Sequence, residues 1–463
     1  MTDILALLQC LHPYLTKSTL RQMSHILPAI ITMTGRVTML GISRWTEKGG
    51  SYRTIQRFYT TAIPWALIFW LFVRQHLVRP GGTYLLAGDE SVVTKSGKAT
   101  FGLDRFFASL VGKVIPSLAF FALSLIDIEQ RRSYPTAVEQ VIRSEAEKAA
   151  SQAKKKARKK VVKKSASGTR KVGRPKGSRN RDKTQVVWTP ELRLIHNMIQ
   201  KQLCLIGQWL TITHLLLDGK FGHNNAVQMA LGCGLHLVSK MRHDAALYFP
   251  YDGPYGGHGP RRQYGDKINY ASLPAEYLKE TSTQDDIQTY IYQVTMLHKE
   301  FAARLNVVII RKHNVKTDKW AQVILFSSDL GLTYAQIIDY YSLRFQIEFN
   351  FREAKQYWGL EDFMNVEETA VTNAANLSLF MVNVAQVLMR HFRQQYADFN
   401  VLDLKAFFRG HKYVAETLKL LPEKPEPILM SHIFEQVSQL GSIHYAPPSS
   451  MPAYLAKVLT LRW

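Results

Sequence analysis

The stretch YAQIIDYYSLRFQIEFNFREAKQY, residues 334–357, decides how the rest of the chain is interpreted. Its apolar spacing predicts one long helix. At ~100° per residue, four polar side chains of that helix fall within an arc of ~60°: Tyr341, Arg344, Glu348 and Lys355. The other faces are mostly apolar, which is typical of a buried helix. A charged stripe there is costly unless it is paired, bound to metal or facing a polyanion. Taken alone, the stripe is explained simply by a structural pair of Arg344 and Glu348.

Two aspartates elsewhere in the chain widen that interpretation. Asp89 and Asp218 each follow an apolar run that predicts a strand, at residues 84–87 and 213–217, and each stands beside a glycine. For either aspartate alone, a role in a turn or at a strand end is the common explanation. As ends of neighbouring central strands, however, they would share one edge of the sheet. With Glu348 they form a set of hard oxygen ligands suited to two Mg²⁺ or Mn²⁺ ions.

The order of the predicted elements indicates a mixed α/β fold. Helical spacing covers residues 1–80, and mostly helical sequence runs from residue 334 to the end. Between them we expect strands at 84–87, 106–111, 118–126, 213–217, 235–238, 307–310 and 322–326, helices at 189–206 and 224–231, and a loop at 248–266. Strands followed by alternating helices and strands are typical of a mixed sheet with helical flanks.

The composition excludes several classes of protein. The chain has 463 residues, with 59 Lys and Arg against 36 Asp and Glu, and its net charge of +23 indicates a polyanionic partner. Three scattered cysteines are too few for a disulfide framework or a structural zinc site. No run reaches ~18 apolar residues, and the first residues lack the features of a signal peptide. We therefore expect a cytoplasmic protein without membrane contact.

Much of the positive charge lies in residues 148–183, where 16 basic residues accompany one acidic residue. Such a run repels itself and cannot be buried, so we interpret residues 144–187 as a solvated basic insertion. Residues 173–177, Gly-Arg-Pro-Lys-Gly, resemble the core of an AT-hook with one arginine missing. Minor-groove reading by Arg174 and Lys176 and nonspecific phosphate binding both remain open.

The polar stripe also resembles a known family. Its residues reproduce, with two, three and six residues between them, the Tyr-Arg-Glu-Lys signature of bacterial insertion-sequence transposases of the DDE class, in the subgroup that excises through a DNA hairpin. The residues around both aspartates, 88–91 and 217–221, and the block 95–98 are similar to that family as well. The resemblance extends over roughly residues 80–365.

That resemblance implies a ribonuclease-H-like core with Asp89, Asp218 and Glu348 as the residues that bind the two metal ions. It implies that the rest of the signature binds phosphates at the transposon end, and that a β-rich insertion, here residues 243–330, precedes the catalytic glutamate. The family also uses an aromatic residue to hold a flipped base. Trp320 and Trp358 are candidates for that role, although packing explains either one.

The N-terminal region suggests a second DNA contact. Residues 43–45 and 51–57 flank two glycines, a pattern that fits a helix-turn-helix carrying Arg44 and Arg53, or equally an ordinary helical hairpin. The histidines on either side of Asp218, His214 and His223, lack a partner at metal-ligand spacing, which favours structural roles.

These observations predict three regions: a helical domain at 1–80 that binds DNA ends, a catalytic domain at 81–370, and a helical region at 371–463. The apolar stripe of the last region either forms a homodimer interface or covers the core. The favoured hypothesis is a cut-and-paste transposase acting on double-stranded DNA. The alternatives are a metal-dependent nuclease without strand transfer and a domesticated DNA-binding protein that keeps the fold.

Overall fold

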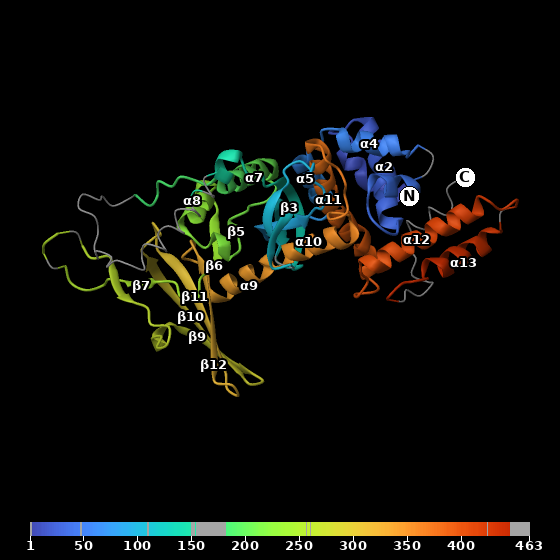
Figure 1. Cartoon of the computed structure of the whole chain (residues 1–463). Helices are drawn as coiled ribbons and strands as arrows, with labels where there is room; N and C mark the ends of the chain where they lie inside the picture. Colours follow the sequence, from blue (N-terminus) through green and yellow to red (C-terminus); the bar gives the residue numbers. More distant parts are fainter. Residues whose placement is uncertain are drawn as a thin grey trace.

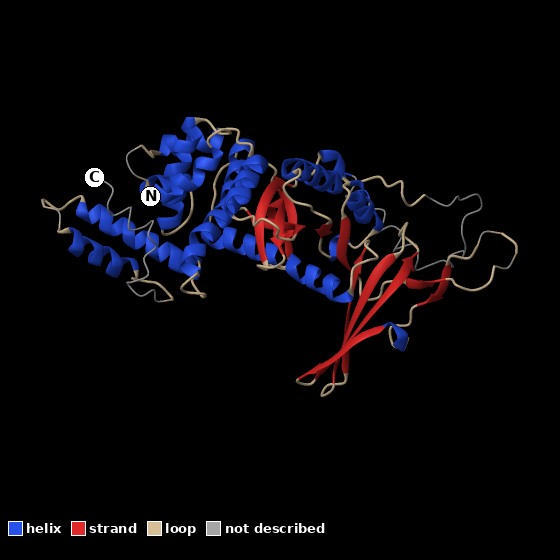
Figure 2. Cartoon of the chain, turned by 180° about the vertical axis from the view of Figure 1, so that it is seen from behind, coloured by secondary structure: helices blue, strands red, loops and turns tan. Residues whose placement is uncertain are grey.

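The computed structural model describes residues 2–46, 49–108, 111–149, 153, 182–255, 257–259, 261–423 and 425–444. The protein is mixed α/β, with a large mixed sheet and helices at both ends of the chain (Figure 1). This architecture confirms the fold class predicted from the sequence and is consistent with a ribonuclease-H-like core. Seen from behind, the central strands of the sheet lie between a helical end and an arm of long strands (Figure 2).

In the described part of the chain the sheet has twelve strands, in the order β2-β3-β1-β5-β6-β12-β11-β10-β7-β8, with β4 on β3 and β9 on β10. The central strands β1, β5 and β6 are parallel neighbours, whereas the other pairs are antiparallel. The strands are β1 Tyr84–Thr94, β2 Asp104–Ala108, β3 Lys113–Asp127, β4 Arg132–Gln140, β5 His214–Leu216, β6 His236–Met241, β7 Leu247–Pro250, β8 Tyr264–Lys267, β9 Leu278–Gln284, β10 Ile287–His298, β11 Leu305–Asn314 and β12 Lys319–Ser327.

The central strands have apolar residues on both faces because helices cover both sides of the sheet. Leu86 and Leu215 pack with α7 (Pro190–Ile206) and α8 (Asn224–Gly232) on one face. Ala87 and Leu216 pack with α9 (Tyr334–Arg344) on the other face. The predicted start of α7 is confirmed: the hydroxyl of Thr189 accepts a hydrogen bond from the amide of Leu192, and proline occupies the first position.

The β-rich insertion at residues 243–330 continues the core sheet through the pairing of β12 with β6. Its strands β9 to β12 extend beyond the core as the arm visible in Figure 1. The sequence prediction of a plain loop at 248–266 was wrong in part, because the short strands β7 and β8 lie at its ends. It also missed β4, whose polar and proline-containing sequence hides a strand that is buried by its neighbours.

The prediction of one continuous helix at 334–357 was wrong. The structure has two helices, α9 and α10 (Gln346–Tyr357), which meet at Phe345. The amide of Phe345 bonds to the carbonyl of Ser342, and the amide of Glu348 bonds to the carbonyl of Phe345, both three residues back along the chain. This tighter hydrogen bonding interrupts the α-helical pattern.

The helices at the two ends of the chain pack together. The N-terminal helices are α1 Thr2–Leu8, α2 Lys17–Thr32, α3 Met39–Trp45, α4 Tyr52–Thr60 and α5 Trp65–His76, and the C-terminal ones are α11 Glu368–Arg393, α12 Val401–Leu418 and α13 Pro427–Ser438. Of the described helices, α11 is long and apolar enough to cross a membrane, and 89% of its most apolar stretch is buried inside the protein.

The apolar stripe of α11 lies in the core that joins both ends of the chain, so it is not exposed as an interface. The residues that form this stripe are all buried: Leu377, Phe380, Met381, Val384 and Val387. Phe380 packs against Trp65, Phe69 and Phe72 of α5, with ring centroids 4.9–6.0 Å apart. The stripe therefore covers the core.

Replacing Phe380 by alanine should lower the free energy of unfolding by about 3–5 kcal/mol, because it leaves a cavity among three aromatic rings. Urea unfolding followed by tryptophan fluorescence measures the loss. Leu420→Ala is the control, since Leu420 is 85% exposed and its truncation should cost less than about 0.5 kcal/mol. Equal losses in the two variants would contradict this packing.

Candidate active site

The two predicted aspartates lie on neighbouring strands of the sheet. Asp218 follows the end of β5 as predicted, but the prediction that Asp89 ends its strand was wrong, because pairing with β3 continues β1 to Thr94. In the parallel pair β1–β5, Ala87 is opposite Leu216, and Asp89 and Asp218 each follow two residues later. Because side chains alternate along a strand, both aspartates point to the face that α9 covers. On the opposite face of β1, Gly88 has no room for a side chain. A Cβ there would lie 2.7 Å from the Phe121 ring.

A guanidinium joins Asp89 to the predicted catalytic glutamate. Arg344, in the last turn of α9, donates from Nη1 to Oδ2 of Asp89 at 3.1 Å and from Nη2 to Oε1 of Glu348 at 2.9 Å. The Arg344 side chain is only 12% exposed, and its guanidinium lies 5.6 Å from the centre of the Tyr341 ring. The break at Phe345 therefore leaves Arg344 and Glu348 on the same side, facing β1.

The carboxylates of this site are poorly solvated. Burial raises the pKa of Asp89 to about 6, although Arg344 opposes that shift. Burial also raises the pKa of Asp218, again opposed by Arg344. Oδ1 of Asp218 is buried and has no hydrogen-bond partner in the part of the chain that the structure describes. A carboxylate oxygen in that condition favours a bound cation.

This donor set fits a divalent metal such as Mg²⁺ or Mn²⁺, whose ligands are carboxylate oxygens. Asp89, Asp218 and Glu348 are the residues that would hold it. Across the described residues, however, no three acidic, histidine or cysteine side chains come together as a ready-made metal site. Arg344 stands between two of the three carboxylates and supplies positive charge there.

The last residue of the signature contacts the same strand. Nζ of Lys355 donates to the carbonyl of Val92 at 2.8 Å, three residues beyond Asp89, and lies 3.4 Å from a carboxylate oxygen of Glu361. Burial raises the pKa of Tyr341, with Arg344 acting against that shift. The structure thus brings all four signature residues to the side of β1 that carries Asp89.

Sequence reasoning missed a neighbouring ion-pair cluster. Lys220, two residues after Asp218, donates to Oε2 of Glu90 at 2.8 Å and also pairs with Glu191 at the start of α7. It links three elements beside the site, and its charge opposes the raised pKa of Asp218. The residues are visible in the sequence, but their pairing depends on how α7 meets the sheet.

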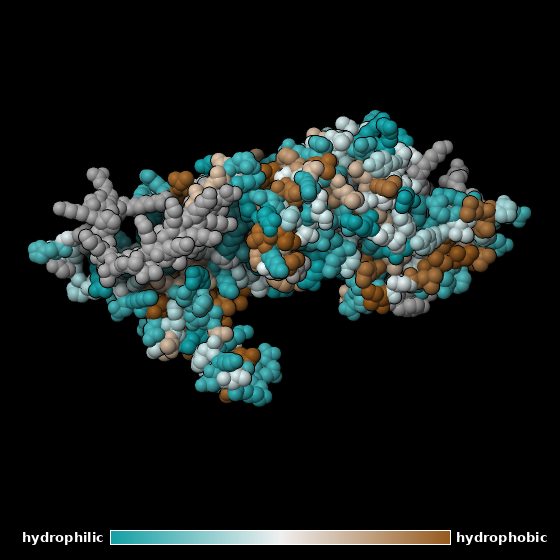
Figure 3. Space-filling view, viewed as in Figure 1, coloured by the Kyte–Doolittle hydropathy of each residue, from teal (hydrophilic) through white to brown (hydrophobic). Residues whose placement is uncertain are grey.

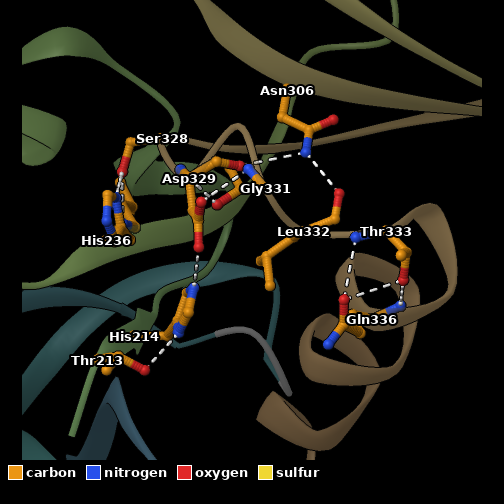
Figure 4. Close-up of polar contacts among 12 residues, drawn as sticks. Thr213, His214, His236, Asn306, Ser328, Asp329, Gly331, Leu332, Thr333 and Gln336 are labelled. Atoms are coloured by element: carbon orange, nitrogen blue, oxygen red, sulfur yellow. Dashed lines mark hydrogen bonds and ion pairs between the residues drawn. The ribbon is translucent and has the colours of Figure 1, made fainter.

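The polar network in Figure 4 fixes where α9 begins. His214 at the start of β5 bonds through Nε2 to Asp329 at 3.1 Å and through Nδ1 to the Thr213 hydroxyl at 2.8 Å. The side-chain amide of Asn306 donates through Nδ2 to the carbonyls of Asp329 and Leu332, directly before the capping box of α9. These contacts confirm a structural role for His214. His223 is structural too, because it caps α8.

The remaining predicted site residues lie elsewhere. Arg44 and Arg53 are exposed on α3 and α4, in the helical end of Figure 1. Arg174 and Lys176, with most of the basic insertion, lie outside the described residues.

The structure also separates the two tryptophan candidates. Trp358 is buried, and its indole NH donates to Glu353 at 2.9 Å, which supports packing. Trp320 is half-exposed on the arm, where its ring is stacked on that of His313 with the centroids 4.3 Å apart.

A family comparison agrees with this geometry. A mixed sheet that carries two aspartates on neighbouring strands beside a helical glutamate is typical of metal-dependent enzymes that act on phosphodiesters. The chain matches the family described as DDE superfamily endonuclease over residues 10–298, more than half of its length. It therefore belongs to that family and is an enzyme of the endonuclease class. A search of curated proteins found no match.

The raised pKa of Asp89 generates a prediction for the metal-free protein. Since the folded state disfavours the ionised carboxyl, Asp89→Asn should stabilise the fold by about 3 kcal/mol at pH 8, where that carboxyl is ionised. The gain should shrink as the pH falls from about 6 to about 4, because the unmutated carboxyl then takes up its proton. Thermal unfolding in EDTA across this range measures the effect.

The exposed Asp398→Asn serves as the control and should change stability little at any pH. A loss of stability in Asp89→Asn at pH 8 would show that the Arg344 pair outweighs burial.

Proposed function

We propose that this endonuclease is a cut-and-paste transposase that excises an insertion sequence through hairpin-ended DNA and joins its 3′ ends to target DNA. The observation that carries the proposal is the position of the Tyr-Arg-Glu-Lys signature against β1. Arg344 contacts both Asp89 and Glu348, and Lys355 contacts Val92 of the same strand. Family membership supports cutting, and the signature supports the hairpin route.

The proposed chemistry is four transfers at phosphorus. Water breaks a phosphodiester at the transposon end and leaves a 3′-hydroxyl. That hydroxyl attacks the opposite strand and closes a hairpin, with release of the flanking DNA. A second water reopens the hairpin, and the 3′-hydroxyl then attacks a target phosphodiester. Two bound divalent ions would supply activation of the attacking oxygen and stabilisation of the leaving oxygen.

The chain's own residues have distinct roles in this scheme. Asp89, Asp218 and Glu348 would hold Mg²⁺ or Mn²⁺. Arg344 presents a planar fork that suits a phosphate, while Lys355 supplies a point charge further along β1. Tyr341 lies against the guanidinium and limits its movement.

DNA binding would extend beyond the catalytic residues. Arg44 and Arg53 on the N-terminal helices are proposed to contact the terminal repeat. The basic insertion, with Arg174 and Lys176, would bind duplex DNA through phosphates or the minor groove. A protein that acts on chromosomal DNA in this way would be cytoplasmic and associated with the nucleoid.

We also propose that the DNA complex contains a homodimer, since two transposon ends must be processed together. The α11 stripe is buried, so the interface would use other surfaces. Exposed apolar side chains gather over α12 and α13, in the brown area at the right of Figure 3; they include Leu420, Leu421, Ile428 and Leu429.

The proposal is tested with a plasmid that carries the DNA flanking the gene, incubated with protein and Mg²⁺. Glu348→Ala should lower cutting by at least about 10³-fold and leave DNA binding intact, because only the carboxylate is lost. Denaturing gels detect hairpin ends. Glu368→Ala, at an exposed position of α11, is the control and should cut normally.

Hairpin-ended and cleanly excised fragments are the expected products. Random nicking would favour the alternative, a nuclease without strand transfer. Normal cutting by Glu348→Ala would show that Glu348 is not part of the catalytic site. DNA binding by the unmutated protein without any cutting would favour a domesticated DNA-binding protein.

A further inference from the structure

Arg344 forms its hydrogen bonds with carboxylates that the proposed function assigns to the metal ions. We infer that Arg344 is an internal counter-ion, which holds the site closed to metal in the free protein. Its release from Asp89 and Glu348 would be coupled to capture of a DNA phosphate. This inference rests on the proposed function and adds a mode of regulation to the same site.

Arg344 and a metal ion would compete for the same carboxylate oxygens. Oδ2 of Asp89 and Oε1 of Glu348 both accept hydrogen bonds from the guanidinium, at 3.1 and 2.9 Å. The other oxygen of Asp89 accepts from the amide of Glu90 at 2.8 Å. A divalent ion binds carboxylate oxygens at ~2.0–2.1 Å and would face a buried positive charge at close range. The guanidinium and the metal therefore exclude one another in this arrangement.

The site also leaves two buried polar atoms unpaired while Arg344 is in place. Nε of Arg344 and Oδ1 of Asp218 are both buried without a hydrogen-bond partner among the described residues. An unpaired buried donor and an unpaired buried acceptor each cost free energy. A phosphate that accepts from Arg344 and a metal that binds Asp218 would satisfy both atoms at once.

Phosphate binding by Arg344 and metal binding by the carboxylates would be coupled. A guanidinium can bind one phosphate through two parallel hydrogen bonds, but here its Nη1 and Nη2 groups are used on two separate carboxylates. If a DNA phosphate draws Arg344 away, metal affinity rises, and by linkage bound metal raises the affinity for that phosphate by the same factor. A chain with a net charge of +23 contacts DNA nonspecifically. Such coupling would keep the site free of metal on DNA whose phosphates do not bind Arg344.

The test measures Mn²⁺ binding by the full chain without DNA, using electron paramagnetic resonance of free Mn²⁺. Arg344→Gln should bind Mn²⁺ about tenfold more tightly than the unmutated chain, because the competing charge is gone. Arg352→Gln, on the exposed face of α10, removes the same charge without touching the carboxylates and should leave the affinity unchanged. Equal or weaker binding by Arg344→Gln would overturn the inference.

Asp218→Asn, made in both backgrounds, separates this inference from the proposed function. If it weakens Mn²⁺ binding while Arg344→Gln has no effect, the metal site stands and the counter-ion role fails. If Asp218→Asn has no effect in either background, the metal site itself is wrong.

A second measurement needs no variant. Modification of Arg344 by phenylglyoxal, mapped by mass spectrometry on the unmutated chain, should become several-fold faster with saturating Mn²⁺, since the guanidinium is then released. A rate that Mn²⁺ does not change would overturn the inference even where Arg344→Gln fails to fold.

Discussion

The charge balance between one buried guanidinium and its surrounding carboxylates is the constraint on which this site depends. The parallel pairing of β1 with β5 brings Asp89 and Asp218 together, which buries two like charges close to each other. The positive charge of Arg344, which forms ion pairs with Asp89 and Glu348, offsets these two negative charges. Loss of both carboxylate partners would leave the buried guanidinium uncompensated, which is strongly destabilising. Any cation that binds the carboxylates must take over that role.

The contacts at both ends of α9 fix the position of Arg344. Its helix begins at a capping box on Thr333, and the loop before it is fixed by Asn306 and by the bond between Asp329 and His214. The tight turn at Phe345 then directs α10 along β1. Both helices thus present polar residues to one strand while their other faces join apolar clusters.

Much of the fold and the site could be predicted because the signals are local. Apolar runs that end at Asp89 and Asp218 predict strands, and the spacing of the signature predicts a helical face. What the sequence hides depends on tertiary contacts. The break at Phe345 has no proline or glycine to mark it, β4 is polar and is buried only by its neighbours, and the Lys220 cluster forms only when α7 meets the sheet. The basic insertion around Arg174 and Lys176 lies outside the described residues.

Asp89, Asp218 and Glu348 are proposed to form one metal site once Arg344 turns to a DNA phosphate. Anomalous diffraction from crystals grown with Mn²⁺ and a duplex of the flanking DNA tests this most directly. We expect manganese peaks among the three carboxylates and an Arg344 guanidinium against a phosphate. Manganese bound elsewhere, or bound there with Arg344 still bridging Asp89 and Glu348, would contradict it.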